Sequence, residues 1–219
     1  MTAWHERLRN EPGPEIEQRL PRHSKRKDLR GLPADWRERM VARLPNYRLA
    51  VLVQAVTGCR PDELVNGVNL EIQRGYLVAT IKSSKVTAKT GQPWRRLCWQ
   101  VDSESPLVGD LVAAVQAGAS MAKIKNAKAY SGAVRAAGAR EWPRRKTTVT
   151  PYCFRHAAAS DMKASGIDKA LISQALGHCS DVTKQYYGSY HQAQGGAVTP
   201  DLVEAARAVQ VAEKPSFSK

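Results

Sequence analysis

The sequence has few cysteines and no long apolar segment. Its four cysteines, Cys59, Cys98, Cys153 and Cys179, are widely spaced and form no Cys-x-x-Cys pair. A zinc ribbon or zinc finger is therefore not indicated, and we expect buried free thiols and no metal. The longest obvious apolar run covers residues 49–53, far too short to cross a bilayer, and the first residues lack a signal-peptide core. We therefore expect a cytoplasmic protein without membrane association.

Glycine-rich phosphate loops are also missing, and acidic residues are outnumbered. Neither a Gly-x-x-x-x-Gly-Lys-Ser/Thr loop nor a Gly-x-Gly-x-x-Gly turn occurs, so we expect no nucleotide cofactor. In a chain of 219 residues, 34 Lys and Arg stand against 20 Asp and Glu, a net charge of +14. Such an excess favours a polyanionic partner, although a solvated basic surface would have the same composition.

The pattern along the chain divides it into three parts. Residues 1–33 contain four prolines and a basic cluster, which predict a basic, flexible arm. Residues 34–190 predict one α+β domain that is mostly helical. Residues 191–219 predict a C-terminal tail with one amphipathic helix over residues 199–211.

Within the domain, start and stop signals at Pro, Asp, Asn and Gly delimit the helices. We predict helices over residues 35–44, 46–57, a short one from 61, 106–117, 126–140, 151–166, 168–176 and a short one capped by Ser180 that ends before Gly188. Segments rich in Val, Ile, Tyr and Trp predict three strands, over residues 68–72, 76–82 and 94–101. These strands form a small antiparallel sheet.

Four short patterns occur in a fixed order in this basic chain. The first is the turn TGCRPDEL over residues 57–64, and the second is a lysine on the predicted β-hairpin. The third is YCFRH over residues 152–156, and the fourth is LGH over 176–178, followed nine residues after His178 by Tyr187. Each pattern alone would occur by chance in many proteins, whereas all four in this order are hard to explain by chance.

With these motifs, residues 32–190 resemble the catalytic domain of the tyrosine recombinases, the phage-integrase family. The resemblance implies a fold of helices around a three-stranded sheet. It also implies an enzyme that cleaves and rejoins DNA through a covalent 3′-phosphotyrosine, without metal or ATP. Further, it implies double-stranded DNA as partner, a homo-tetramer on synapsed DNA sites (a monomer without DNA being an alternative), and a role in a phage or mobile element.

The resemblance assigns a role to each motif residue. Arg60 and Arg155 resemble the arginines that bind the scissile phosphate, and His178 resembles the residue that hydrogen-bonds it. Lys85 resembles the hairpin lysine that protonates the leaving oxygen, and Tyr187 resembles the nucleophile. The residue types suit this chemistry, because arginine binds phosphate oxygens in pairs and keeps its charge. Nearby cations also favour ionisation of a phenol whose reference pKa is about 10.

Simpler interpretations exist for the same residues. Arg60 would also form an ordinary ion pair with Glu63, although in this turn we expect Glu63 to hold the guanidinium from behind. Arg155 would be a solvated charge on an isolated helix, but the alanines after it let the helix pack closely and direct Arg155 inward. His178 would serve equally as a cap for helix carbonyls. Tyr186 competes with its neighbour as the nucleophile.

Several basic residues lie outside the motifs. Lys82 is the alternative to Lys85 as the hairpin lysine. We predict that a set of basic side chains contacts the DNA backbone: Lys82, Lys89, Arg95, Arg96, Arg144, Arg145 and Lys146.

Two departures from the family pattern bear on function. Tyr152 stands where most relatives have histidine, and a phenol donates a hydrogen bond but is a poor general base near neutral pH. Most relatives also carry a separate helical domain before the catalytic one, so the chain is either a fragment or a minimal form.

The leading hypothesis is a site-specific recombinase or integrase. We expect its C-terminal helix to dock on a neighbouring subunit or to pack on its own subunit. A type IB topoisomerase-like enzyme would use the same residues, and a non-catalytic DNA-binding protein would retain the fold.

Overall fold

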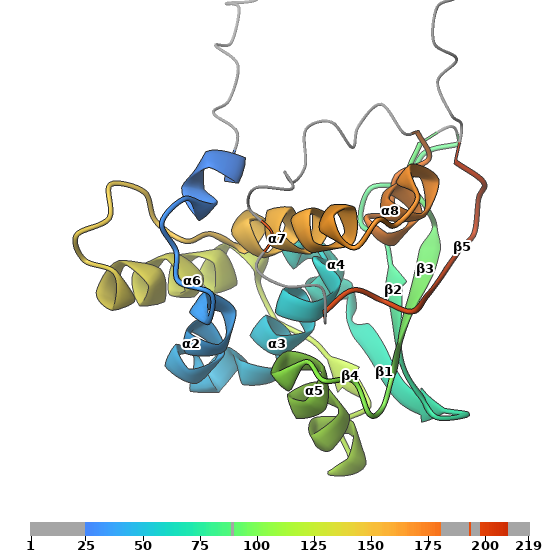
Figure 1. Ribbon diagram of the computed structural model, residues 1–219, viewed down its shortest axis with the longest axis horizontal. Coiled ribbons are helices and arrows are strands. Elements are labelled where there is room, and N and C mark those ends of the chain that lie inside the picture. The colour runs from blue at the N-terminus through green and yellow to red at the C-terminus, as the bar shows by residue number, and fades with distance from the viewer. Residues whose placement is uncertain (1–24, 89, 181–192, 194–197, 210–219) are drawn as a thin grey trace, which may run out of the picture.

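The computed structural model describes residues 25–88, 90–180, 193 and 198–209. Helices lie on one side of a single twisted sheet (Figure 1). The helical elements are η1 (Lys25–Leu29), α2 (Trp36–Arg43), η2 (Pro45–Tyr47), α3 (Arg48–Thr57), α4 (Pro61–Asn66), α5 (Pro106–Gln116), α6 (Ala127–Glu141), α7 (Pro151–Ala164) and α8 (Lys169–Ala175). The strands are β1 (Val68–Gln73), β2 (Tyr76–Lys82), β3 (Trp94–Gln100), β4 (Met121–Ala122) and β5 (Leu202–Ala205).

The mostly helical α+β fold predicted from the sequence is confirmed, and the seven helices predicted between residues 35 and 176 are present. Residues 181–187, where a short helix was predicted after Ser180, lie outside the described residues. One start is displaced: the helix expected from residue 46 begins at Arg48, because Pro45–Tyr47 form a short 3-10 turn.

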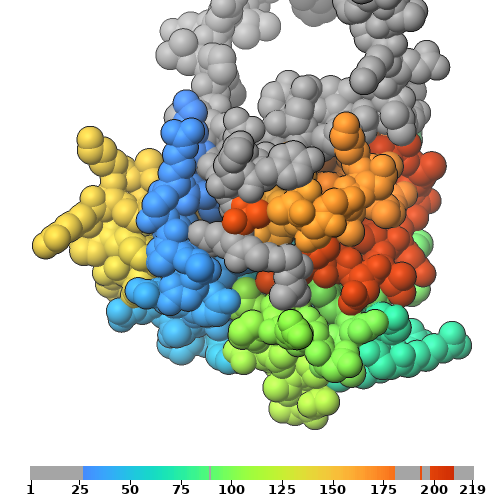
Figure 2. Space-filling view, viewed as in Figure 1, coloured from blue at the N-terminus to red at the C-terminus, as the bar shows by residue number. Residues whose placement is uncertain are grey.

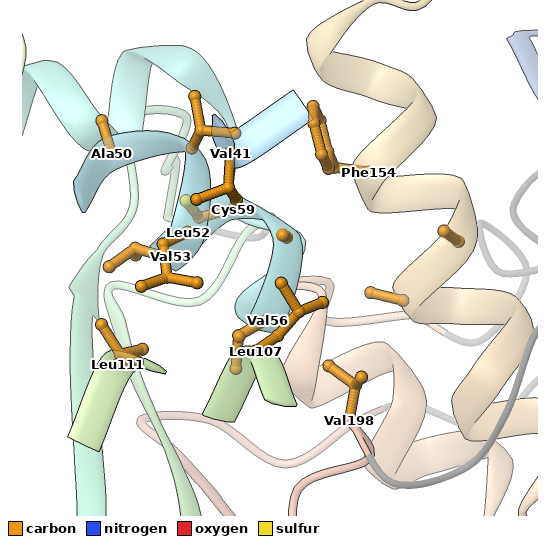
Figure 3. Close-up of a cluster of buried hydrophobic side chains, with 14 of the residues drawn as sticks. Val41, Ala50, Leu52, Val53, Val56, Cys59, Leu107, Leu111, Phe154 and Val198 are labelled. Carbon is orange, nitrogen blue, oxygen red and sulfur yellow. The ribbon is translucent and has the colours of Figure 1, made fainter. Parts of the chain in front are cut away.

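Helix α3 forms the centre of the core. Every residue from Ala50 to Thr57 is buried, as an apolar surface on all sides of a helix requires. The helix packs against α2, α5 and α7, and side chains from these elements meet around it (Figure 3). It ends at Gly58, which adopts the left-handed conformation (φ 64°). The Thr57–Arg60 turn is therefore fixed to the most buried element of the molecule.

The sheet is larger than predicted. The three expected strands pair antiparallel, with Val68 opposite Ile81 and Tyr76 opposite Gln100. Two short strands extend the sheet to five, in the order β4-β1-β2-β3-β5. The expectation of a three-stranded sheet was therefore incomplete, because two-residue and four-residue strands carry too little pattern to be detected.

The C-terminal segment was predicted wrongly. Residues 202–205, expected within a helix over 199–211, form β5 instead and pair with β3, Leu97 opposite Val203. The edge of β3 offers main-chain hydrogen bonds that outweigh a local helical pattern. In the space-filling view, residues 198–209 adjoin α8 on the same face of the molecule (Figure 2).

The domain begins earlier than residue 34. Element η1 packs against α7, and both Leu29 and Leu32 are buried in the core. The guanidinium of Arg145 donates hydrogen bonds to the carbonyls of Asp28 (2.6 Å) and Arg30 (2.8 Å). Residues 25–33 are therefore part of the folded domain, and Arg145 holds this segment; the contact of Arg145 with DNA stays a prediction.

All four cysteines are free thiols, three of them buried. Within the described ranges, no helix is long and apolar enough to span a membrane.

Two glycines of α6 allow a test of core packing. A β-carbon at Gly138 would lie 2.9 Å from the Cβ of Val149, whereas one at Gly132 would meet nothing within 4 Å. We expect Gly138→Ala to lower the free energy of unfolding by about 1–3 kcal/mol through overpacking. Gly132→Ala should raise it by about 0.5–1 kcal/mol through helix propensity. Urea unfolding of both variants checks this pair, and equal effects would contradict the close α6 contact.

Candidate functional site

The turn that carries Arg60 lies directly against α7. A β-carbon at Gly58 would lie 3.0 Å from the Cβ of Ala158 and 3.4 Å from the Cα of Arg155. Glycine is therefore needed for its left-handed φ and for the close approach of the two backbones. This contact brings the first and third sequence motifs together.

Side-chain hydrogen bonds fix the same turn. The Thr57 hydroxyl accepts a hydrogen bond from the amide of Cys59 (3.1 Å). The amide group of Gln54 donates to the carbonyl of Cys59 (2.9 Å) and accepts from the hydroxyl of Tyr130 (2.8 Å). The backbone before Arg60 is thus held on both sides.

Glu63 binds two arginines. Its carboxylate accepts hydrogen bonds from the backbone amide (2.7 Å) and the guanidinium (3.0 Å) of Arg60. It also accepts two parallel bonds from Arg95, of 3.0 and 2.9 Å. The expected contact between Glu63 and Arg60 is present.

Arg95 does not lie where the sequence analysis placed it. Predicted to contact DNA, it is fully buried; besides Glu63, it donates to the carbonyl of Ala175 (2.7 Å). Its guanidinium also limits the size of the residue at position 177, because a β-carbon at Gly177 would lie 2.9 Å from Nη1 of Arg95. Strand alternation could have revealed this burial, because Leu97 and Trp99 face the same side of β3. Arg95 therefore links β3, α4 and the end of α8.

Arg155 points inward from α7 and is 1% exposed. Its Nη1 donates to the carbonyl of Gly58 (3.0 Å), and its Nη2 donates to the carbonyl of Leu176. Nη2 also lies 3.0 Å from Nε2 of His178. Because arginine only donates, this imidazole nitrogen accepts, and the ring of neutral His178 carries its proton on Nδ1.

The charges of this cluster shift two pKa values. Burial lowers the pKa of His178, and the positive charges of Arg155, Arg60 and Arg95 lower it further, to about 3. Burial alone would raise the pKa of Glu63, but the neighbouring arginines, Arg95 above all, hold it at about 2. At neutral pH, the cluster therefore contains three guanidinium groups, one carboxylate and a neutral imidazole. The excess positive charge of this cluster suits an anion with several oxygens, such as a phosphate.

The other predicted catalytic residues are exposed or lie outside the described residues. Tyr152 is partly exposed on the first turn of α7 and lines a hollow of about 460 Å³ together with Pro61 and Arg135. Lys85 is exposed on the loop between β2 and β3. Tyr187 and its competitor Tyr186 lie outside the described residues.

The remaining basic residues differ in exposure. Lys82 and Arg96 line a hollow of about 580 Å³ on the outer face of the sheet, where Arg96 lies over the ring of Trp94 (5.6 Å). Arg144 and Lys146 are exposed after α6, and Lys89 lies outside the described residues. In the described segments, no three His, Cys, Asp or Glu side chains come together in a way that could hold a metal ion.

The fold is similar to that of site-specific recombinases. The crystal structure of XerA recombinase matches with a TM-score of 0.51 and 21% identity, covering 71% of this chain and 58% of that one. XerH site-specific recombinase bound to difH substrate matches before cleavage (TM-score 0.51, 17% identity, 77% of this chain and 50% of that one). The complex after cleavage, on a palindromic difH substrate, matches with a TM-score of 0.50 and 16% identity, covering 71% of this chain and 48% of that one.

The chain thus spans about half the length of the recombinases it resembles. No protein-family model matches the sequence, and no curated protein matches it. The resemblance predicted from the four motifs agrees with these structures at the level of the fold.

Two neighbouring arginines on β3, Arg95 and Arg96, allow a test of the buried ion pair between Arg95 and Glu63. Arg95→Met leaves the fully buried Glu63 without its bidentate partner, so we expect a loss of about 3–5 kcal/mol in unfolding free energy. Arg96→Met removes an exposed side chain whose ion pair with Glu204 spans 3.6 Å, and should change stability by less than about 1 kcal/mol. Urea unfolding distinguishes the two variants. A small loss of unfolding free energy for Arg95→Met would indicate that Arg95 is exposed, as the sequence analysis expected.

The neutral state of His178 predicts a pH dependence. With a folded pKa of about 3 and an unfolded value of 6.5, the unfolded chain binds the extra proton as the pH falls through this window. Stability should therefore decrease below pH 6.5, by about 2 kcal/mol at pH 5. Below pH 4.5, protonation of Glu63 should add to the loss.

Unfolding of the parent and of His178→Gln at pH 7 and pH 5 measures this contribution. We expect the variant to lose less stability between the two pH values than the parent does. An equal loss in both proteins would show that His178 ionises normally.

Proposed function

We propose that the protein is a site-specific DNA recombinase that cleaves and rejoins strands through a covalent 3′-phosphotyrosine. The observation that carries this proposal is the meeting of Arg60, Arg155 and His178, from three separate segments, in one cationic cluster. The fold similarity to XerA and XerH recombinases supports it, and XerH was solved on its DNA substrate. The partner is double-stranded DNA, bound by a tetramer on two synapsed sites.

In the proposed reaction, Arg60 and Arg155 donate hydrogen bonds to the non-bridging oxygens of the scissile phosphate. Nearby cations favour the phenolate of Tyr187, whose proton passes to solvent water. The phenolate oxygen attacks phosphorus, and the bond from phosphorus to the 5′ oxygen breaks. Lys85 gives a proton to that leaving oxygen, and neutral His178 donates a hydrogen bond to the phosphate. A 5′ hydroxyl of the second DNA reverses the step, so the bond energy is kept and no ATP is needed.

Other groups act around the reacting atoms in this proposal. Glu63 orients Arg60, and Arg95 keeps the buried carboxylate in place from the opposite side. Tyr152 provides a hydrogen-bond donor rather than a general base. The exposed side chains of Lys82, Arg96, Arg144 and Lys146 contact the DNA backbone, and we assign the same role to Lys89.

A covalent trapping experiment tests the proposed chemistry. Duplexes enriched by binding to the protein are nicked a short distance 3′ of each candidate site, so that the short fragment bearing the free 5′ hydroxyl diffuses away after cleavage. We expect a protein–DNA adduct on a denaturing gel for the parent and for Tyr186→Phe, and none for Tyr187→Phe. Arg155→Met should slow adduct formation about 100-fold, because a preorganised donor to the transition state contributes about 3 kcal/mol.

The same assay, together with a plasmid relaxation assay, distinguishes the alternative functions. An adduct that persists in Tyr187→Phe and disappears in Tyr186→Phe would place the nucleophile one residue earlier. Bound duplexes without any adduct would contradict the enzyme and favour a non-catalytic DNA-binding protein. Plasmid relaxation by a monomer, without exchange between two marked DNAs, would favour a topoisomerase.

A further inference from the structure

Gln92 is a buried polar residue at the meeting point of three segments. It lies at the end of the loop between β2 and β3 and is 0% exposed. Its backbone amide donates to the carbonyl of Gly177 (3.3 Å), which ties the loop to the turn after α8. An apolar side chain would fill the same space without the free-energy cost of burying an amide group. The hydrogen bonds of the Gln92 side chain therefore need an explanation.

Both ends of the Gln92 side chain are used. The Nε2 group donates to the carbonyl of His178 (3.1 Å) and to the carbonyl of Arg207 (2.8 Å). The Oε1 atom accepts from the backbone amide of Arg207 (2.8 Å). The amide therefore pairs with the chain beyond β5 as a neighbouring strand would, and reaches the backbone of His178 at the same time.

Arg207 extends this connection to the hairpin loop. Its Nη1 group donates to the carbonyls of Thr87 (2.9 Å) and Gly91 (3.2 Å). The loop turns tightly at this point, since a β-carbon at Gly91 would collide with the carbonyl oxygen of Lys85. The segment after β5 thus binds the backbone of the loop that carries Lys85, at Thr87 and Gly91, while Gln92 binds the backbone of His178.

We propose that Gln92 is a positioning residue that fixes His178 and the Lys85 loop relative to each other, and that it does so only while β5 is docked on β3. Its effect on catalysis rests on the proposed function, whereas its effect on the geometry of His178 does not. The separation allows the two to be tested independently.

Gln92→Met keeps the length of the side chain and removes both hydrogen-bonding ends. Gln100→Met is the matched control, because Gln100 is exposed at the far end of β3, the strand that follows the loop with Gln92. We expect Gln92→Met to accelerate hydrogen exchange in residues 83–93 and 174–180, and to slow adduct formation about 10- to 100-fold. Gln100→Met should match the parent in both measurements.

The titration of His178, followed by NMR of the imidazole in folded protein without DNA, provides a readout that stability alone would not change. We expect the pKa of His178 to rise towards 6.5 in Gln92→Met as the ring becomes more hydrated. An unchanged titration and unchanged exchange would overturn the proposal, even if the variant unfolds at a lower temperature.

Arg207→Met provides a second variant if Gln92→Met does not fold. It keeps the backbone bonds to Gln92 and removes the two bonds to the hairpin loop, so exchange should accelerate in residues 83–91 and not in 174–180. Equal exchange in both segments would overturn the proposed division of roles. If the parent itself forms no adduct, the proposed function fails, and the exchange and titration results still decide the role of Gln92.

Discussion

The rest of the site depends on the ion pairs that the carboxylate of Glu63 forms with two arginines. It binds Arg60, the N-cap residue of its own helix, and Arg95 of the sheet; the contact with Arg60 is partly buried and the contact with Arg95 is fully buried. Three arginines could not be brought together in the interior without an anion, because an unpaired buried charge costs several kcal/mol. Glu63 therefore compensates the charge of the cluster and joins the sheet to the helices.

The same positive charges determine the state of His178. An imidazole in this environment remains neutral, so it accepts a hydrogen bond from Arg155 rather than repelling it. A bound phosphate would bring negative charge next to the ring and favour its protonation. The site is thus electrostatically different before and after an anion binds, although the residues that line it are the same.

The sequence predicted much of the fold and part of the candidate site. Strong local signals mark the helix end at Gly58, the helix start at Pro61 and the strands rich in β-branched residues. These elements are present in the structure. The strand β5 was missed because pairing with the edge of β3 overrides its local helical pattern. Arg95 was placed on the surface because a charged residue is usually solvated, and only its position on the inward side of β3 indicates otherwise. The contacts of Gln92 depend on residues more than eighty positions away, which no local pattern records.

Gly177 shows how two distant constraints act on one position. Its φ of 74° favours glycine, but asparagine also adopts this conformation at modest cost. The guanidinium of Arg95 removes that alternative, because any side chain at residue 177 would collide with it. The glycine of the Leu-Gly-His motif is therefore tied to an arginine of the sheet as well as to the helix end. Any replacement at position 177 would need a smaller residue at position 95, and with it a different partner for the buried acid.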